Sequence, residues 1–261
     1  MCDTCGCQDE NNKYGIKFPG DKTHNEANIH DHYHEHEHDD EHHHHAKKIR
    51  LEKDILSSNN LLAERVRGYF ESRKIFAINM VSSPGSGKTS VIKATIDELK
   101  SKLKIYVIEG DQQGTLDADI IKQAGAEVIQ INTGDGCHLS AEMVYDALKK
   151  IDPQSGSLVI IENVGNLVCP AMFDLGESKR VVVSSVSEGD NKPLKYPNMF
   201  LSSDLCILNK MDLLNYCDFD LSLFKDNIRR VNHHLEVIEL SVRGKSNLKA
   251  WFDWLLKNVN P

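Results

Sequence analysis

Eight consecutive residues combine the glycines and side chains that hold a phosphate group: Ser82-Ser83-Pro84-Gly85-Ser86-Gly87-Lys88-Thr89. Gly85 and Gly87 allow backbone N–H groups to approach a β-phosphate. Lys88 can reach the β and γ oxygens, and the Thr89 hydroxyl can bind Mg²⁺. Ser82 stands where the strict pattern G-x-x-x-x-G-K-[ST] has glycine. A simple Gly/Ser turn is the alternative, but an apolar run before the segment and a helix-like stretch after it favour a phosphate-binding loop.

A second motif, Asn209-Lys210-Met211-Asp212, follows a short apolar run further along the chain. The Asp212 carboxylate can accept hydrogen bonds from N1 and N2 of guanine, which adenine cannot supply. Leaving such acceptors unpaired disfavours ATP strongly. Four residues recur by chance, so the motif alone is weak evidence. Because the motif follows a phosphate loop in the sequence, we assign Asn209, Lys210 and Asp212 to a GTP site and predict a GTPase.

Acidic residues follow two further apolar runs, in Glu109-Gly110-Asp111 and in Glu162-Asn163-Val164-Gly165. Acids at the carboxyl ends of parallel strands face the crevice where ligands bind. Asp111 and Glu162 are therefore candidates for Mg²⁺ coordination or for positioning the attacking water, together with Lys88 as catalytic residues. Gly165 can bring its backbone N–H to a γ-phosphate. Helix capping by Asp111 and a solvated Glu162 are the alternative.

Cys137 and His138 lie in a glycine-rich turn, and Cys169 follows the Glu162–Gly165 segment. Two thiolates and an imidazole suit Zn²⁺ or Ni²⁺, and sulfur ligands disfavour Mg²⁺ and Ca²⁺. Spacing alone is weak evidence, because single cysteines are often small buried hydrophobes.

The N-terminal segment holds a different kind of candidate metal site. Cys2, Cys5 and Cys7 lie close to the α-amino group, and three thiolates with one nitrogen can satisfy square-planar Ni²⁺. Residues 24–45 contain ten histidines mixed with acids, which suits many weak metal sites. An expression tag is the alternative for His42–His45, but the irregular His/Asp/Glu mixture upstream argues against it.

Charge divides the 261-residue chain into two parts. Residues 1–46 carry 11 acidic and 3 basic residues, which accounts for the whole formal net charge of −8, and the remainder has 28 of each. We therefore expect a disordered metal-binding tail at 1–46 and one GTPase domain at 47–261. The absence of a basic field argues against nucleic-acid binding. The chain also lacks the ~18–20 apolar residues of a membrane span and the pattern of a signal peptide, which favours the cytoplasm.

Short apolar runs alternating with amphipathic stretches position these motifs. This alternation predicts an α/β fold: a mostly parallel sheet with helices on both faces, as in P-loop NTPases. The expected strands are 75–81, 105–109, 127–131, 158–162, 180–186, 205–209 and 236–240. The expected helices are 47–73, 88–103, 116–123, 140–149, 223–232 and 248–257.

Taken together, the motifs resemble the HypB family of hydrogenase nickel-incorporation GTPases, which are related to the urease accessory G protein UreG. The resemblance covers the N-terminal cysteine motif and about 47–261. Its specific stretches are the phosphate loop, Glu109–Gln113, Gly136–Leu139, Glu162–Pro170 and Asn209–Asp212. Ser82 in place of glycine is usual for this family.

The resemblance implies a GTPase that delivers Ni²⁺ during maturation of [NiFe]-hydrogenase and dimerises around GTP. It implies a HypA-type metallochaperone and the hydrogenase large-subunit precursor as partners, and a metal site at Cys137, His138 and Cys169. The histidine tract suggests added nickel storage. A nickel buffer that uses GTP only for assembly, and a urease-maturation GTPase, remain alternatives.

Overall fold

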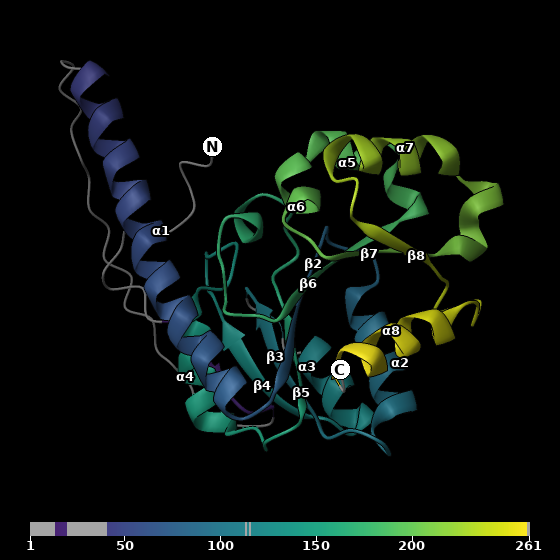
Figure 1. The fold of residues 1–261 in the computed structure, drawn as a ribbon, viewed down its shortest axis with the longest axis horizontal. Coiled ribbons are helices and arrows are strands. Elements are labelled where there is room, and N and C mark those ends of the chain that lie inside the picture. Colours follow the sequence, from purple (N-terminus) through teal and green to yellow (C-terminus); the bar gives the residue numbers. More distant parts are fainter. Residues whose placement is uncertain (1–13, 20–40, 113, 115, 260–261) are drawn as a thin grey trace.

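One eight-stranded sheet forms the centre of the molecule (Figure 1). The computed structural model describes residues 14–19, 41–112, 114 and 116–259, with only the backbone of 41–52. Strand order is β1-β4-β3-β5-β2-β6-β7-β8, and all neighbours are parallel except β1 and β4. The strands are β1 (Gly15–Lys17), β2 (Phe76–Ser82), β3 (Ile105–Asp111), β4 (Glu127–Asn132), β5 (Leu158–Glu162), β6 (Lys179–Ser185), β7 (Leu205–Asn209) and β8 (Glu236–Glu239).

Helices cover both faces of the sheet, as expected for parallel strands that are buried on both sides. Helices α2 (Lys88–Leu99), α3 (Leu116–Ala124) and α8 (Leu248–Val259) pack on the face that carries Ile78 and Met80 of β2. On the opposite face, α1 (Glu41–Ser72) and α4 (Ala141–Ile151) cover one half, and α6 (Pro197–Leu201) and α7 (Leu221–Val231) cover the other. The predicted α/β fold with a mostly parallel sheet is confirmed.

Neighbouring residues of β2 point to opposite faces, so one continuous apolar run supplies two cores. Ile78 and Met80 join the core beneath α2, whereas Ala77 and Val81 join the cores on the other face.

Helix ends follow local capping signals: Ser140 accepts a hydrogen bond from Met143 N at the start of α4, and Asp220 accepts one from Leu223 N at the start of α7. The seven runs predicted as strands all form strands, within two residues at each end.

The first strand was not predicted, because residues 1–46 were expected to form a disordered tail. Gly15–Lys17 pairs antiparallel with Asn132–Gln130 at the sheet edge, and the Tyr14 hydroxyl donates to Asp146 at 2.7 Å. Three residues are too few to give a strand pattern, so a partner edge decides their conformation. The predicted sites at Cys2, Cys5 and Cys7 and at residues 24–40 lie outside the described residues.

Other differences concern short or terminal elements. Helix α1 begins at Glu41, six residues before its predicted start, and no glycine or proline separates Glu41 from Lys47. Helix α2 ends at Leu99 rather than 103, where Lys102 N and Leu103 N both donate to Leu99 O at 2.8 Å. Five short elements, each at most six residues long, were not predicted: η1 (Cys169–Ala171), η2 (Val186–Glu188), α5 (Lys192–Lys195), α6 (Pro197–Leu201) and η3 (Met211–Tyr216). Across the described part of the chain, no helix combines the length and apolar character needed to cross a membrane.

Candidate functional site: a phosphate loop beside a cysteine–histidine cluster

The phosphate loop connects the central strand β2 to helix α2. Gly85 and Gly87 adopt φ values of 77° and 95°, which L side chains rarely adopt. Ser82 has no such conformation, since it is the last residue of β2, and its hydroxyl donates to Ser83 O at 2.8 Å. A serine therefore replaces the first glycine of the motif without backbone strain. The loop opens directly onto the N-terminus of α2, where backbone N–H groups and the helix dipole favour an anion.

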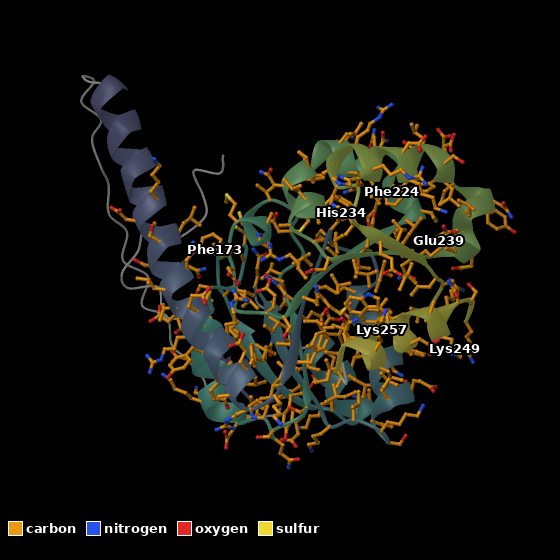
Figure 2. All side chains as sticks on the ribbon, viewed as in Figure 1. Phe173, Phe224, His234, Glu239, Lys249 and Lys257 are labelled. Carbon is orange, nitrogen blue, oxygen red and sulfur yellow. The ribbon has the colours of Figure 1, made fainter. Side chains whose placement is uncertain are left out.

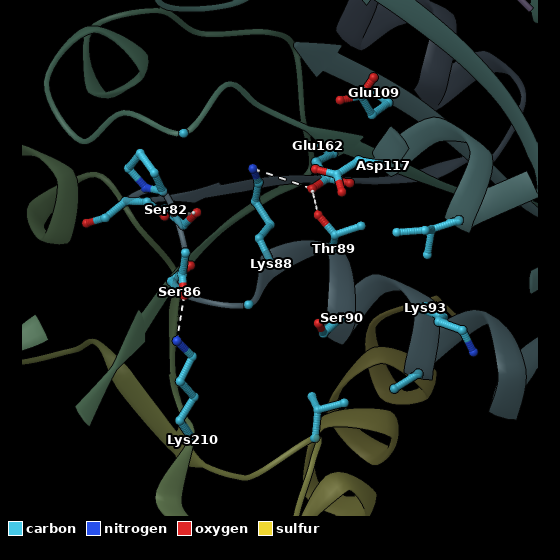
Figure 3. Close-up of a pocket in the computed structure, with 18 of the residues that line it drawn as sticks. Ser82, Ser86, Lys88, Thr89, Ser90, Lys93, Glu109, Asp117, Glu162 and Lys210 are labelled. Atoms are coloured by element: carbon cyan, nitrogen blue, oxygen red, sulfur yellow. Dashed lines mark hydrogen bonds and ion pairs between the residues drawn. The ribbon is translucent and has the colours of Figure 1, made fainter. Parts of the chain in front are cut away.

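Lys88 and Thr89 both point toward Glu162 at the end of β5 (Figure 3). Thr89 Oγ1 donates to Glu162 Oε1 at 2.7 Å, and Lys88 Nζ lies 3.5 Å from the same oxygen. Lys88 Nζ also donates to the backbone carbonyl of Asn163 at 2.6 Å. The ammonium group has three N–H donors, so it can hold these groups and still bind a phosphate oxygen.

Glu162 and Glu109 face each other across the β3–β5 pair, and both side chains are buried. The pKa of Glu109 is raised to about 9, mainly by burial and also by the neighbouring Glu162, Asp111 and Asp117 carboxylates, while Lys88 lowers it. Burial also raises the pKa of Glu162, while Lys88 and Thr89 lower it. Glu109 therefore holds a proton at neutral pH. Its part in the site was missed, because the sequence places it beside Asp111 but does not reveal its burial.

The residues at this position fit a Mg²⁺ ion. Glu162 Oε2 is buried and has no hydrogen-bond partner among the described residues. It lies beside the Thr89 hydroxyl, and hard oxygen ligands of this kind suit Mg²⁺.

Asp111, at the end of β3, instead accepts hydrogen bonds from Gln112 N at 2.7 Å and Gly114 N at 2.8 Å. Asp111 thus fixes the turn after β3 at the edge of the same cavity.

The Asn209–Asp212 motif contacts the phosphate loop from the end of β7. Asn209 Nδ2 donates to Ser86 O at 3.0 Å, and Lys210 Nζ donates to Gly85 O at 2.6 Å. A Cβ atom on Gly87 would collide with the Asn209 amide, so glycine is required there for a second reason. These contacts bring a segment far along the chain against the loop.

Asp212 is exposed, and its carboxylate accepts a hydrogen bond from the buried Ser241 hydroxyl. Gly244 N in turn donates to Ser241 Oγ at 2.8 Å. The turn after β8 therefore orients Asp212. Sequence reasoning did not identify Ser241, because a lone serine after a strand carries no signal until its neighbour in space is known.

Two further groups border the phosphate loop. A Cβ atom on Gly165 would lie 3.2 Å from Pro84 Cγ, so the segment after β5 passes directly over the loop. On the other side, Lys192 Nζ donates to Ser83 Oγ at 2.9 Å and lies 3.5 Å from Glu188. Lys192 was not predicted, since nothing in its surrounding sequence links it to the loop.

A cavity of about 1430 Å³ lies over these groups, larger than the roughly 300–1,000 Å³ of common ligand pockets. Its walls include the phosphate loop, the acids of β3 and β5, and Lys210, Val242 and Lys245 on the side of the Asn-Lys-Met-Asp motif. It therefore runs from a phosphate-binding end toward Asp212, an extent that suits a nucleotide.

Cys137, His138 and Cys169 come together although the cysteines are 32 residues apart. The two Sγ atoms are 2.8 Å apart, longer than the ~2.05 Å of a disulfide, and Cys137 Sγ lies 3.7 Å from His138 Nδ1. One ligand atom from each residue lies within 4.8 Å of the others. A glycine-flanked turn and the short helix η1 supply the three side chains.

The donor set fits a soft or borderline divalent ion such as Ni²⁺ or Zn²⁺. Burial lowers the pKa of His138 to about 4, so its imidazole is neutral and can bind a metal at neutral pH. The His138 ring stacks on Phe173 with centroids 3.9 Å apart, and Figure 2 shows Phe173 in the loops between α1 and the sheet. Three ligands from one chain leave a coordination position for another group.

A phosphate loop between a central parallel strand and a helix, faced by acids from two neighbouring strands, defines a P-loop nucleotide-binding protein. The family model for the CobW/HypB/UreG nucleotide-binding domain matches residues 76–239. The chain belongs to this family, and the resemblance inferred from the sequence is confirmed.

Similar proteins carry the HypB name. The hydrogenase maturation factor HypB of Rhizobium leguminosarum bv. viciae is 54% identical over 207 residues, which is 79% of this chain and 69% of that protein. The crystal structure of hydrogenase maturation factor HypB from Archaeoglobus fulgidus has a TM-score of 0.73 and 36% identity, covering 78% of this chain and all of that one. HypB from Helicobacter pylori in complex with nickel has a TM-score of 0.72 and 34% identity, over 77% and 95% of the chains.

Proposed function

We propose that this protein is a nickel-binding GTPase that delivers Ni²⁺ during maturation of [NiFe]-hydrogenase. One observation carries the proposal: the segment after β5 contacts the phosphate loop at Pro84 and then supplies Cys169 to the metal cluster. Nucleotide state and metal geometry therefore share one short stretch of chain. The names of the relatives, and the nickel complex of the Helicobacter pylori protein, agree with this function.

In the proposed reaction, Lys88 binds the β and γ oxygens, and backbone N–H groups of Ser83–Thr89 hold the β-phosphate. Mg²⁺ bound by Thr89 and Glu162 would neutralise charge on the phosphates. Glu162 keeps Thr89 and Lys88 in place, and Asp111, which lines the same cavity, would position the attacking water. Gly165 presents its backbone N–H to the γ-phosphate because it already passes over Pro84.

The Asn209–Asp212 motif gives the proposed preference for guanine. Asp212 accepts from guanine N1 and N2, and Ser241 fixes the direction of its carboxylate. Asn209 and Lys210 tie this recognition to the phosphate loop by their contacts with Ser86 and Gly85.

Nickel is the cargo of the cluster at Cys137, His138 and Cys169, and Zn²⁺ competes for the same ligands. The open coordination position is filled by the same loop of a second subunit when GTP drives dimerisation, as a closed two-fold interface permits. A HypA-type metallochaperone and the hydrogenase large-subunit precursor are the proposed partners, in the cytoplasm. The cysteines at 2, 5 and 7 form a second, nucleotide-independent nickel site, and the histidine tract stores nickel.

Maturation in cells tests this function. Lys88→Ala and Cys169→Ser should each abolish hydrogenase activity at low nickel, because one removes the phosphate contact and the other a metal ligand. Lys249→Ala, on the exposed side of α8, and Cys217→Ser, which is not one of the grouped metal ligands, are matched controls that should mature hydrogenase normally. Normal maturation in Lys88→Ala would favour a nickel buffer, and loss of urease activity alone would favour a urease factor.

A further inference from the structure

A series of hydrogen-bonded, buried polar side chains connects the phosphate loop to the two segments that carry the metal ligands. The first of these residues is Asn163. The Asn163 carbonyl accepts the 2.6 Å hydrogen bond from Lys88 Nζ. Its side chain is buried, and Oδ1 accepts from Leu139 N at 3.2 Å and from Val164 N at 3.0 Å. Leu139 directly follows His138. One residue therefore touches the phosphate lysine and the metal-binding turn.

This series of hydrogen bonds continues across the sheet to the segment that carries Cys169. Asn163 Nδ2 donates to Asn79 Oδ1 at 3.3 Å, and Asn79 Nδ2 donates to Glu177 Oε1 at 3.1 Å. Glu177 Oε1 forms an ion pair with the buried Arg180, whose Nη2 lies 2.8 Å away. Arg180 then donates to Ala171 O at 3.2 Å and to Phe173 O at 2.9 Å.

These last contacts lie at the metal cluster. Ala171 is two residues beyond Cys169 in η1, and Phe173 is the ring on which His138 stacks. We call Asn163, Asn79, Glu177 and Arg180 the Asn163 network. It reaches the turn of His138 directly and the helix of Cys169 through the ion pair.

Burying four polar side chains in a sheet is costly unless their donors and acceptors are paired. A polar network is not needed to hold β2, β5 and β6 together, because apolar contacts at Ile78, Ile160 and Val181 already do so. The network instead connects the phosphate lysine with both loops that carry metal ligands. A fully paired network of this kind is rigid, so displacement of one end moves the other.

We propose that Asn163 is the positioning residue that couples nucleotide state to metal affinity, with Asn79, Glu177 and Arg180 extending the coupling to Cys169. A γ-phosphate attracts the Lys88 ammonium, and the Asn163 carbonyl follows it because both groups share one hydrogen bond. The Asn163 amide then shifts Leu139 and the ligand His138. This inference rests on the proposed function, in which GTP binds at Lys88 and nickel at Cys137, His138 and Cys169.

The test uses the full-length protein and measures a ratio. The affinity for a non-hydrolysable GTP analogue is determined with and without saturating Ni²⁺, and the coupling factor is the ratio of the two values. Wild type should give a factor of about 5–150, the usual range for coupled sites. Asn163→Ala should bring the factor to about 1, because the backbone contact to Lys88 remains but the contact to Leu139 is lost.

Asn166→Ala is the matched control, since Asn166 lies in the same segment and its side chain accepts from Val168 N and from no other group among the described residues. It should keep the wild-type factor. The thiolate-to-nickel charge-transfer absorption gives a second readout that a loss of stability alone would not produce. It should change with nucleotide in wild type and Asn166→Ala, and not in Asn163→Ala.

The outcomes separate the two proposals. A wild-type factor near 1 would overturn the proposed function itself. A coupled wild type with an equally coupled Asn163→Ala would overturn only the role of Asn163. If Asn163→Ala does not fold, the isosteric Asn163→Asp replaces it. Aspartate can still accept from Leu139 N, but it cannot donate to Asn79 Oδ1, so it tests the arm of the network that leads to Cys169. An unchanged factor in Asn163→Asp would overturn the coupling through Asn79, and a reduced factor would support it.

Discussion

Two carboxyl groups, Glu109 and Glu162, lie opposite each other at the ends of β3 and β5. Two buried like charges this close are unfavourable, so one group keeps its proton. Glu162 has Lys88 and Thr89 as partners, whereas Glu109 Oε2 has no hydrogen-bond partner among the residues that the structure describes. Glu162 is therefore the better ligand for a cation, whereas Glu109 lines the cavity as an uncharged carboxylic acid.

Replacing Glu109 with glutamine should make stability less dependent on pH. The folded-state pKa is raised from 4.5 to about 9, so the stability that Glu109 contributes is complete below about pH 4.5 and is lost as pH rises toward 9. Over that range the free energy of unfolding of wild type should fall relative to Glu109→Gln, by up to about 6 kcal/mol at 1.36 kcal/mol per pKa unit.

Urea denaturation at a series of pH values, without magnesium, measures this difference. Glu236→Gln, at an exposed position at the start of β8, is the control and should run parallel to wild type. Parallel curves for wild type and Glu109→Gln would mean that Glu109 ionises normally.

Asp212 carries the proposed choice of base. Asp212→Asn should weaken GTP binding by roughly 10–150-fold, corresponding to the ~1.5–3 kcal/mol of a hydrogen bond to a charged group. It should also favour xanthosine triphosphate, whose base has a carbonyl where guanine has its amine. Competition binding with both nucleotides measures the preference, and Asp218→Asn, exposed in the same region, should bind as wild type does. An unchanged base preference would remove Asp212 from this role.

At the scale of residues, the sequence predicted what local spacing determines. The phosphate loop keeps its chemistry within eight residues, so its glycines, lysine and threonine were identified directly. The pairing of Cys137 with Cys169 and of Asp212 with Ser241 depends on the fold, so a family resemblance was needed for the first and the structure for the second. The Asn163 network was not predictable, because the side-chain partners of Asn79 are Asn163 and Glu177, which lie 84 and 98 residues further along the chain.

The secondary-structure elements follow a simple rule: those that were predicted create their own pattern, and those that were missed depend on a partner. Strands such as Leu158–Glu162 and Leu205–Asn209 are apolar runs buried on both faces, and their bounds match the prediction. Strand β1 has three partly buried residues and exists as a strand through its pairing with β4. Strand β4 leads into the turn that carries Cys137 and His138, so β1 pairs with the strand that precedes the candidate metal cluster.

Two truncations test how the N-terminal segment contributes. Deleting residues 1–13 leaves β1 in place, whereas deleting 1–46 removes it and the Tyr14–Asp146 hydrogen bond. Both proteins should lose the proposed nickel site at Cys2, Cys5 and Cys7 and keep the proposed GTP hydrolysis. Only the longer deletion should lower the free energy of unfolding, by about 1–3 kcal/mol for the lost hydrogen bonds and apolar contacts.

Hydrolysis rates, nickel stoichiometry and chemical denaturation of both truncations measure these effects. Loss of hydrolysis in the longer truncation would contradict the division of the chain at residue 46. Equal stability of the two proteins would show that β1 does not contribute to the sheet in solution.

At the scale of the whole molecule, the parallel sheet places all the chemistry at one end. The carboxyl ends of β2, β3, β5 and β7 supply the phosphate loop, the acids and the Asn-Lys-Met-Asp motif, and the segments after β4 and β5 supply the metal ligands. A nucleotide and a nickel ion can therefore act on the same segment, 162–170. Linkage requires that if GTP changes nickel affinity, nickel changes GTP affinity by the same factor.

The most direct test is calorimetric titration of a GTP analogue, with and without Ni²⁺, into protein lacking residues 1–46. This protein has neither the N-terminal cysteines nor the histidine tract, so the cluster at Cys137, His138 and Cys169 is the nickel site under test. Cys137→Ser in the same background is the control and should show no effect of nickel. If the cluster is coupled to the nucleotide site, nickel should change the affinity by about 5–150-fold. Equal affinities with and without nickel would contradict nucleotide-gated delivery.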